Sequence, residues 1–168
     1  MFYTTIITLH DSVTKESIAR KVLVDLPSWF GIQEATEKYV TDASEMPFLA
    51  AYDNDKPVGF IALKATSPAC AEIFVMGIIK EYHRQGIGKK LHLAYEKLAR
   101  GLGYSYSQVK TIALGKYETY NQSNYFYRAM GYEALEIFPE LWHVNNPCQI
   151  YIKYLGNHRC KRFRFKAR

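Results

Sequence analysis

Apolar residues recur along the chain at two different spacings, and these predict an alternation of helices and strands. Spacings of three to four residues indicate amphipathic helices, as with Ile18, Val22 and Leu26 in the first of them. We expect helices at residues 12–26, 32–40, 86–102 and 120–130. Short alternating or continuous apolar runs predict strands at 1–9, 48–52, 58–65, 72–79, 109–114, 132–138 and 148–155.

The order of these elements predicts a mixed α/β protein with one strand–helix–strand unit near its middle. That unit runs from the near-continuous apolar strand 72–79 through the helix 86–102 to the strand 109–114. The chain has 168 residues, 48% of them hydrophobic, and we find no repeat or linker in it. It is therefore long enough for one domain with a core of its own.

The formal charge of +6 comes from the C-terminal end of the chain. Six of the 22 basic residues and none of the 16 acidic ones lie within residues 159–168, so the rest of the chain is balanced. We expect one domain over residues 1–157 and a flexible basic tail over 158–168. Nucleic-acid-binding domains usually carry basic charge across a folded face, which argues against that function. The tail alternates cations with Phe163 and Phe165, so it is either a solvated terminus or a strip that touches RNA, DNA or anionic lipid.

Cysteine number and hydropathy favour a cytoplasmic protein without metal. Cys70, Cys148 and Cys160 are an odd number without C-x-x-C spacing, which argues against a disulfide framework or a zinc ribbon. No apolar run approaches the roughly 18 residues of a membrane span, and residues 1–10 do not read as a signal peptide. The histidines form no ligand pattern, and we place His92 on the solvent side of its helix.

The segment with the most chemical information is the junction between the strand 72–79 and the helix 86–102. A short loop with two glycines, Gly86 and Gly88, joins the two elements, and Arg84, Lys89 and Lys90 add positive charge beside it. The start of a helix offers unpaired N–H groups and a partial positive charge, and glycine lets an anion approach the backbone closely. The junction therefore predicts a phosphate site, although the glycines could also serve only a structural turn.

Two familiar phosphate loops do not fit this junction. A Walker A loop has glycine where this chain has His83 and Ser or Thr where it has Lys90. A dinucleotide fingerprint has a third small residue where this chain has Leu91. A third loop fits better: His83-Arg-Gln-Gly-Ile-Gly88 resembles the Q/R-x-x-G-x-G/A pyrophosphate loop of the GNAT N-acetyltransferase superfamily, with His83 as the departure from Q/R.

A second segment strengthens the resemblance to this superfamily. The later helix of the family typically carries an Asn, then a Tyr four residues before a Gly-aromatic pair. Tyr127, Gly131 and Tyr132 match that pattern, while Asn121 and Asn124 both remain candidates for the Asn. The resemblance covers about residues 58–132 with specificity and the remainder by the order of elements.

The resemblance implies a GNAT fold, in which helices flank a twisted, mostly antiparallel sheet with splayed central strands. It implies transfer of an acetyl group from acetyl-CoA to an amine, with acetyl-CoA as cosubstrate. The pantetheine arm would lie beside the strand 73–79, where the Met76 N–H would face the thioester oxygen and Ile78 would pair with the arm. Gly77 marks either a bulge in that strand or close packing against a side chain. The implied cofactor-binding residues are Met76, Gly77, Ile78, His83, Arg84, Gln85, Gly86, Ile87, Gly88, Lys89, Asn121 and Asn124.

Two residues are candidates for proton transfer. Tyr127 would act as general acid, because a phenol is protonated at neutral pH and can donate to a leaving thiolate. The alternative is a core tyrosine, one of 14 in the chain. Glu72 would act as base, since it stands eleven positions before His83, the spacing of the catalytic Glu in histone-type members. The alternative is a strand-end Glu paired with a lysine, with the proton leaving through water.

The acceptor site is expected between the first helices and the last strands. Trp29, Phe30 and Trp142 would offer apolar or cation–π walls to an amine, or would simply cover the core. We expect a small-molecule amine rather than a protein amine, although no residue pattern separates the two, and a homodimer remains open. No Cys or Ser is placed to carry the acetyl group, so direct attack is implied. The rival readings are an acyl-CoA sensor without turnover and a nucleic-acid-associated protein that binds through its tail.

Overall fold

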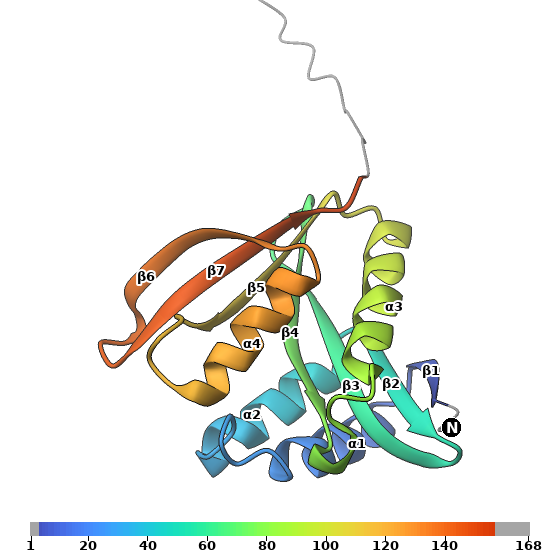
Figure 1. Ribbon diagram of the computed structural model, residues 1–168. Coiled ribbons are helices and arrows are strands. Elements are labelled where there is room, and N and C mark those ends of the chain that lie inside the picture. Colours follow the sequence, from blue (N-terminus) through green and yellow to red (C-terminus); the bar gives the residue numbers. More distant parts are fainter. Residues whose placement is uncertain (1–3, 157–168) are drawn as a thin grey trace, which may run out of the picture.

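A seven-stranded sheet, with the strand order β1-β2-β3-β4-β5-β7-β6, forms the centre of the molecule (Figure 1). The computed structural model describes residues 4–156, so the expected basic tail lies outside the described residues. Neighbouring strands are antiparallel except for the parallel pair β4 and β5. This confirms the predicted mixed α/β architecture with a mostly antiparallel sheet.

The observed elements follow the predicted order throughout. The strands are β1 (Thr4–Leu9), β2 (Phe48–Asp53), β3 (Lys56–Ala65), β4 (Cys70–Ile78), β5 (Tyr106–Ile112), β6 (Glu133–His143) and β7 (Asn146–Tyr154). The helices are α1 (Ser12–Val24), α2 (Gln33–Ser44), the 3-10 turn η1 (Lys80–Tyr82), α3 (Ile87–Gly101) and α4 (Glu118–Ala129). Two elements, α2 and β6, end four or more residues later than predicted. Helix α2 continues because Ala43 and Ser44 are also buried, and β6 continues because His143 still pairs with Asn146.

The helices divide between the two faces of the sheet. A methyl group added at Gly77 of β4 would meet Val22 of α1 and Leu26, two residues beyond that helix, whereas one added at Gly88 of α3 would meet the side chain of Ile78. Successive residues of a strand point to opposite faces, so α1 covers one face and α3 the other. Helix α2 lies against α1 and reaches β4, while α4 packs beside β5. The hydrophobic core fills both layers between helices and sheet.

A buried polar network attaches α3 to the sheet. The hydroxyl of Ser107 on β5 hydrogen-bonds with the hydroxyls of Tyr95 (2.8 Å) and Tyr132 (2.7 Å). His92 Nε2 lies 3.2 Å from the same Tyr132 hydroxyl. His92 is 1% exposed, so its expected place on the solvent side of α3 is wrong. Burial lowers the pKa of His92 to about 4, and Glu96, one turn further along, is bonded to Lys153 and Arg100.

Candidate functional site

The parallel strands β4 and β5 separate after a short paired segment. They pair from Cys70–Ile73 against Tyr106–Val109 and no further, although both strands continue. Figure 1 shows them diverging toward the end of the sheet where α1 and α2 lie. The splayed central strands that the resemblance implied are therefore present. We call the unpaired segments, 74–78 of β4 and 110–112 of β5, the divergent edges.

The divergent edges carry backbone groups that no strand satisfies. The Ile79 N–H donates to the Val58 carbonyl at 2.9 Å, so Gly77 and Val75, at alternate positions, also face β3. The N–H and C=O groups of Met76 and Ile78 consequently point the other way, to the side that β5 has left. By the same alternation, the bond from Ala113 N–H to the Pro147 carbonyl turns the backbone of Ile112 toward β4. An extended ligand placed here would meet strand-like hydrogen-bonding groups on both sides.

The sequence left two readings of Gly77, and the structure decides between them. A Cβ at Gly77 would lie 2.8 Å from Val22 Cγ1 and 3.0 Å from Leu26 Cδ1, so close packing explains the glycine. The irregularity of β4 lies earlier in the strand. The register against β3 shifts between Ala62 and Leu63, which leaves Phe74 as the extra residue on β4. The bulge reading of Gly77 is therefore wrong in its position, since the bulge falls three residues before it.

The loop from His83 to Lys89 presents backbone amides at the start of α3. The first helical bond runs from the Lys90 N–H to the Gly86 carbonyl, so the amides of Ile87, Gly88 and Lys89 have no partner within the helix. Gly86 has φ 80° and forms the N-terminal cap, and Arg84 also has a positive φ of 62°. The side chains of Arg84, Lys89 and Lys90 are exposed around these amides. This arrangement can bind an anion such as a diphosphate.

Tight packing of Gly88 sets the loop close to the end of β4. A Cβ at Gly88 would lie 3.2 Å from both Ile78 Cδ1 and Phe126 Cε2, so a larger residue would push α3 away from β4 and α4. Gln85, which was expected at the cofactor, donates from Nε2 to the Glu81 carbonyl at 2.9 Å. The amides of the loop are thus placed directly beyond the last residue of β4.

His83 ties this loop back to the divergent edge of β4. Its Nε2 lies 2.7 Å from the Ile78 carbonyl oxygen, and because a carbonyl can only accept, Nε2 carries the proton. The ring meets the Trp29 indole edge-on, with 6.2 Å between the ring centroids. His83, which stands where the family has Gln or Arg, therefore places an imidazole ring on the Ile78 carbonyl at the edge of β4.

Tyr127 of α4 is buried among other aromatic rings. Its ring lies 6.0 Å from that of Tyr132 and 6.4 Å from that of Tyr151, centroid to centroid. Burial alone raises the pKa of Tyr127 above its usual range, so the phenol is protonated at neutral pH. Within residues 4–156 its hydroxyl has no recorded hydrogen-bond partner, which leaves it available to a ligand.

Glu72 lies at the start of the divergence and is buried. Its Oε2 accepts from Gln108 Nε2 at 2.5 Å and lies 2.9 Å from Lys110 Nζ. The expected pairing with a lysine is therefore present, and the lysine comes from β5. Both contacts use Oε2, and within residues 4–156 no hydrogen bond or ion pair involves Oε1, so this oxygen can accept a bond from a ligand.

Glu72 and Tyr127 approach the divergence from opposite faces of the sheet. Glu72 binds the side chain of Gln108, whereas Tyr127 contacts Tyr151, which pairs with the next residue, Val109. Consecutive residues of β5 point to opposite faces, so the two candidate proton-transfer groups do as well. A group held between the divergent edges could meet a carboxylate on one side and a phenol on the other.

The two candidate asparagines both have structural bonds. Asn124 is buried, donates from Nδ2 to the carbonyls of Ile112 (2.9 Å) and Tyr120 (2.7 Å), and accepts from the Tyr151 hydroxyl (2.7 Å). Asn121 Oδ1 accepts from the Gly115 N–H at 2.7 Å. Asn124 therefore holds α4 against the divergent edge of β5, and Asn121 orders the loop that precedes the helix.

The three aromatics proposed for the acceptor lie in different surroundings. Trp29 contacts α4 and His83, and Phe30 meets Tyr39 edge-on with 5.8 Å between centroids. Trp142 lies on the outermost strand β6 and is 44% exposed. The sequence missed the aromatic pair Tyr39 and Phe74, whose ring centroids lie 5.5 Å apart. Burial, followed by the charge of Glu72, raises the pKa of Tyr39 above its usual value.

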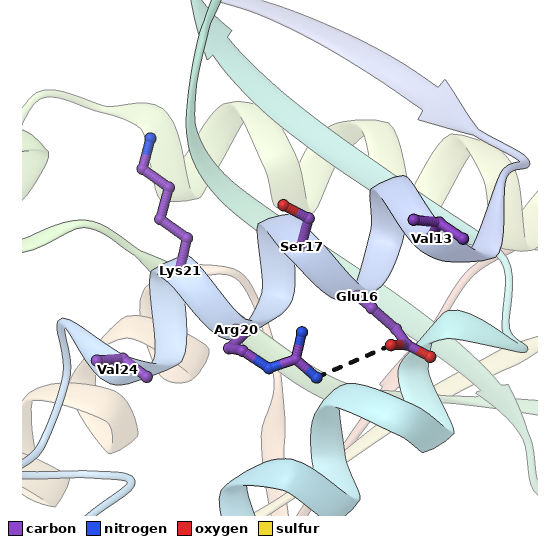
Figure 2. A pocket seen from close by; sticks show the side chains of 6 residues that line it. All are labelled: Val13, Glu16, Ser17, Arg20, Lys21 and Val24. Atoms are coloured by element: carbon purple, nitrogen blue, oxygen red, sulfur yellow. Dashed lines mark ion pairs between the residues drawn. The ribbon is translucent and has the colours of Figure 1, made fainter.

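Surface hollows occur elsewhere on the molecule. Figure 2 shows one on the outer side of α1, lined by Val13, Glu16, Ser17, Arg20, Lys21 and Val24. A smaller one lies along residues 138–141 of β6. Neither is lined by a residue of the divergent edges or of the loop 83–89. No helix within residues 4–156 is long and apolar enough to span a membrane, and that part of the chain contains no cluster of three metal-ligating side chains.

The sequence model of the Acetyltransferase (GNAT) family matches residues 16–132, more than half of the chain. The protein therefore belongs to the GNAT acetyltransferase family, as the loop and the Tyr127 segment predicted. No curated protein matches the chain in sequence.

Solved structures of GNAT proteins share the fold at low sequence identity. An acetyltransferase of this family from Desulfovibrio desulfuricans has 14% identity and a TM-score of 0.76, covering 91% of this chain and 99% of its own. An aminoglycoside 6'-N-acetyltransferase complexed with coenzyme A has 16% identity and a TM-score of 0.73, with 90% and 97% covered. The ribosomal-protein-S18-alanine N-acetyltransferase from Escherichia coli has 15% identity and a TM-score of 0.70, with 91% and 94% covered. At these identities the likeness concerns the fold.

Proposed function

We propose that the protein is an acetyl-CoA-dependent N-acetyltransferase that moves the acetyl group to a primary amine by direct attack in a ternary complex. One observation carries the proposal: an unpaired strand edge at Met76 and Ile78 lies beside the start of α3, whose first amides have no partner within the helix. A coenzyme A thioester has an extended amide-containing arm and a diphosphate, and these two features of the site suit those two parts. Family membership and the coenzyme A complex of a structural neighbour support the same cofactor.

The diphosphate would lie against the amides from Gly86 to Lys89, with the cations Arg84 and Lys89 beside it. Gly86 and Gly88 serve different purposes there. Gly86 permits the left-handed turn at φ 80°, and Gly88 permits close packing against Ile78 and Phe126. The pantetheine arm would then run along β4, pairing with Ile78, and bring the thioester carbonyl to the Met76 N–H. That amide would stabilise the oxyanion that forms when the amine attacks.

Proton transfer would proceed from both faces of the sheet. The amine nitrogen attacks the thioester carbon from the Glu72 side, and its proton passes to Glu72 or to water. The C–S bond then breaks, and the coenzyme A thiolate takes the proton of Tyr127 from the α4 side. Burial raises the pKa of Tyr127 and so keeps the phenol protonated at neutral pH, which leaves its hydroxyl able to hydrogen-bond to the thiolate as the C–S bond breaks.

The cysteines support direct attack over a covalent acetyl-enzyme. Burial raises the pKa of Cys148 to about 11 and raises that of Cys70 as well. Neither thiol is therefore a thiolate nucleophile at neutral pH. Both are free, which fits the reducing cytoplasm where we place this reaction.

The acceptor would approach on the face of the sheet that carries Glu72. Tyr39 and Phe74 provide aromatic surface there, with Glu72 as the anionic group for an amine. Trp29 and Phe30 lie on the connection between α1 and α2 beside this face, and Trp142 would contribute only to a large acceptor. We favour a small-molecule amine as the acceptor. The structural neighbours include an acetyltransferase for aminoglycosides and one for a ribosomal protein, so the test includes both small-molecule and protein amines.

The test is thiol release from acetyl-CoA in the presence of a panel of amines. The panel contains polyamines, aminoglycosides, amino acids and peptides with free N-terminal or lysine amines. We expect amine-dependent release of coenzyme A with at least one member, and the same rate from a chain truncated after Asn157, since the domain would comprise residues 1–157. Saturable binding of coenzyme A with no release across the panel would instead indicate a sensor.

A further inference from the structure

Trp29 links the two sides of the divergence. Its indole Nε1 donates to Ser123 Oγ of α4 at 3.1 Å, and the same ring meets His83 edge-on. Its backbone is held separately, because its carbonyl accepts from the Tyr120 hydroxyl at 2.9 Å and its N–H donates to Leu26. The indole can therefore move while the backbone remains attached.

Trp29 contacts His83 and α4, each of which is bonded to one of the two divergent edges. On the β4 side, the His83 ring donates to the carbonyl of Ile78. On the β5 side, Asn124, the neighbour of Ser123, donates to the carbonyl of Ile112. Trp29 contacts the His83 ring directly and reaches α4 through Ser123, so we infer that side chains cross the entrance between the loop 83–89 and Met76.

Both carbonyls at this entrance are already occupied. The arm of a coenzyme A thioester that pairs with Ile78 needs the backbone group that the His83 ring now holds. The Trp29 indole contacts both the His83 ring, which is bonded to β4, and α4, which packs beside β5, so an arm entering between these elements would meet it. The closed arrangement and an inserted arm are therefore alternatives.

We propose that Trp29 is a positioning residue that closes the entrance to the divergent edges, and that its indole leaves Ser123 and His83 when a coenzyme A thioester binds. This inference rests on the proposed function, since it assumes that the arm enters between β4 and β5. A protein whose competent state is only partly populated binds with an affinity reduced by that fraction. Weakening the Trp29–Ser123 bond therefore favours the open state and strengthens binding.

The first part of the experiment follows the indole directly. The chain has two tryptophans, so a Trp142→Phe protein reports Trp29 alone. We expect its emission to change saturably with coenzyme A, over the concentration range in which a calorimeter detects binding. The Trp29→Phe protein, which retains Trp142 on exposed β6, should show no change.

The second part changes the bond partner of the indole. Ser123→Ala removes the acceptor, and a net hydrogen bond of ordinary strength predicts about fivefold tighter binding of coenzyme A. Ser123→Thr retains the hydroxyl and should bind like the unmodified protein. Gln122→Ala, at the exposed neighbouring position of the same helix, is the matched control and should also leave affinity unchanged.

The outcomes separate this inference from the proposed function. If coenzyme A binds but the Trp29 emission stays constant, or Ser123→Ala binds no more tightly than Gln122→Ala, closure of the entrance by Trp29 is refuted and the proposed function stands. If coenzyme A produces no binding heat with folded protein, both are refuted. A change in Trp29 emission, together with tighter binding by Ser123→Ala but not by Ser123→Thr or Gln122→Ala, supports closure of the entrance by Trp29.

Discussion

Substitution of Gly86 by alanine tests the backbone that would hold the diphosphate. Gly86 has φ 80° and ψ 1°, and no atom lies within 4 Å of the position a Cβ would occupy. The substitution therefore creates no clash, and its cost is conformational. A left-handed residue with a Cβ costs about 1–2 kcal/mol relative to glycine. The loop can either accept that strain or relax and misplace the amides of α3.

The matched control is Gly101→Ala at the other end of the same helix. Gly101 also has open space around it, but it has a helical place in α3, where alanine is favoured by up to about 1 kcal/mol. The two substitutions add the same methyl group, but we expect Gly86→Ala to lower the free energy of unfolding and Gly101→Ala to raise it. Gly86→Asn should recover part of the loss, because asparagine tolerates the left-handed region better than alanine.

The assay combines urea unfolding with calorimetric titration of coenzyme A. We expect Gly86→Ala to lose about 1–2 kcal/mol of unfolding free energy or, where the loop relaxes, to bind coenzyme A roughly tenfold more weakly for each 1.4 kcal/mol. Gly101→Ala should be slightly more stable and bind normally. If both alanine variants are equally stable and bind coenzyme A alike, the role we give to the Gly86 turn is refuted.

Three further predictions concern proton transfer and the network behind α3. Tyr127→Phe should lower turnover by roughly a hundredfold or more while coenzyme A affinity stays within about twofold; unchanged turnover would make Tyr127 a core residue only. Glu72→Gln should lower the rate at pH 7 by roughly a hundredfold or more, the contribution typical of a general base, whereas Lys110→Met should not; a pH–rate profile identical to that of the unmodified enzyme would leave Glu72 as the partner of Lys110 alone. Because the pKa of His92 falls from 6.5 to about 4 on folding, stability should be intact above pH 6.5 and fall as the pH drops, by about 2 kcal/mol between pH 7 and pH 5 in urea unfolding. The His92→Phe protein should lack this fall, and equal slopes for the two proteins would contradict the assignment.

The sequence predicts the fold well because hydrophobic spacing reports burial directly. The continuous apolar run of β4 indicated a central strand, and the two glycines at the start of α3 indicated a tight junction. The splayed strands followed from the resemblance only, since nothing in the composition of β4 or β5 shows where their pairing stops. The bulge was misplaced for a similar reason: Phe74 is extra only relative to the register of β3.

The candidate site was less predictable where a residue has a polar partner far along the chain. Asn124 looks free for a ligand until α4 is placed against Ile112 and Tyr151. His92 appears solvated on a helical pattern, yet Tyr132, forty positions later, covers it. The link from Trp29 to Ser123 spans 94 positions and has no signature in the sequence. Such contacts depend on how helices meet, which periodicity within one helix does not determine.

The most direct measurement of the central claim compares coenzyme A with pantetheine in a calorimetric titration of the same protein. Pantetheine has the arm but lacks the diphosphate that the amides of Gly86 to Lys89 would hold. We predict saturable heat with coenzyme A, loss of that heat when inorganic pyrophosphate competes, and much weaker binding of pantetheine. Equal binding of the two compounds, or no heat from folded protein at millimolar coenzyme A, would contradict the account.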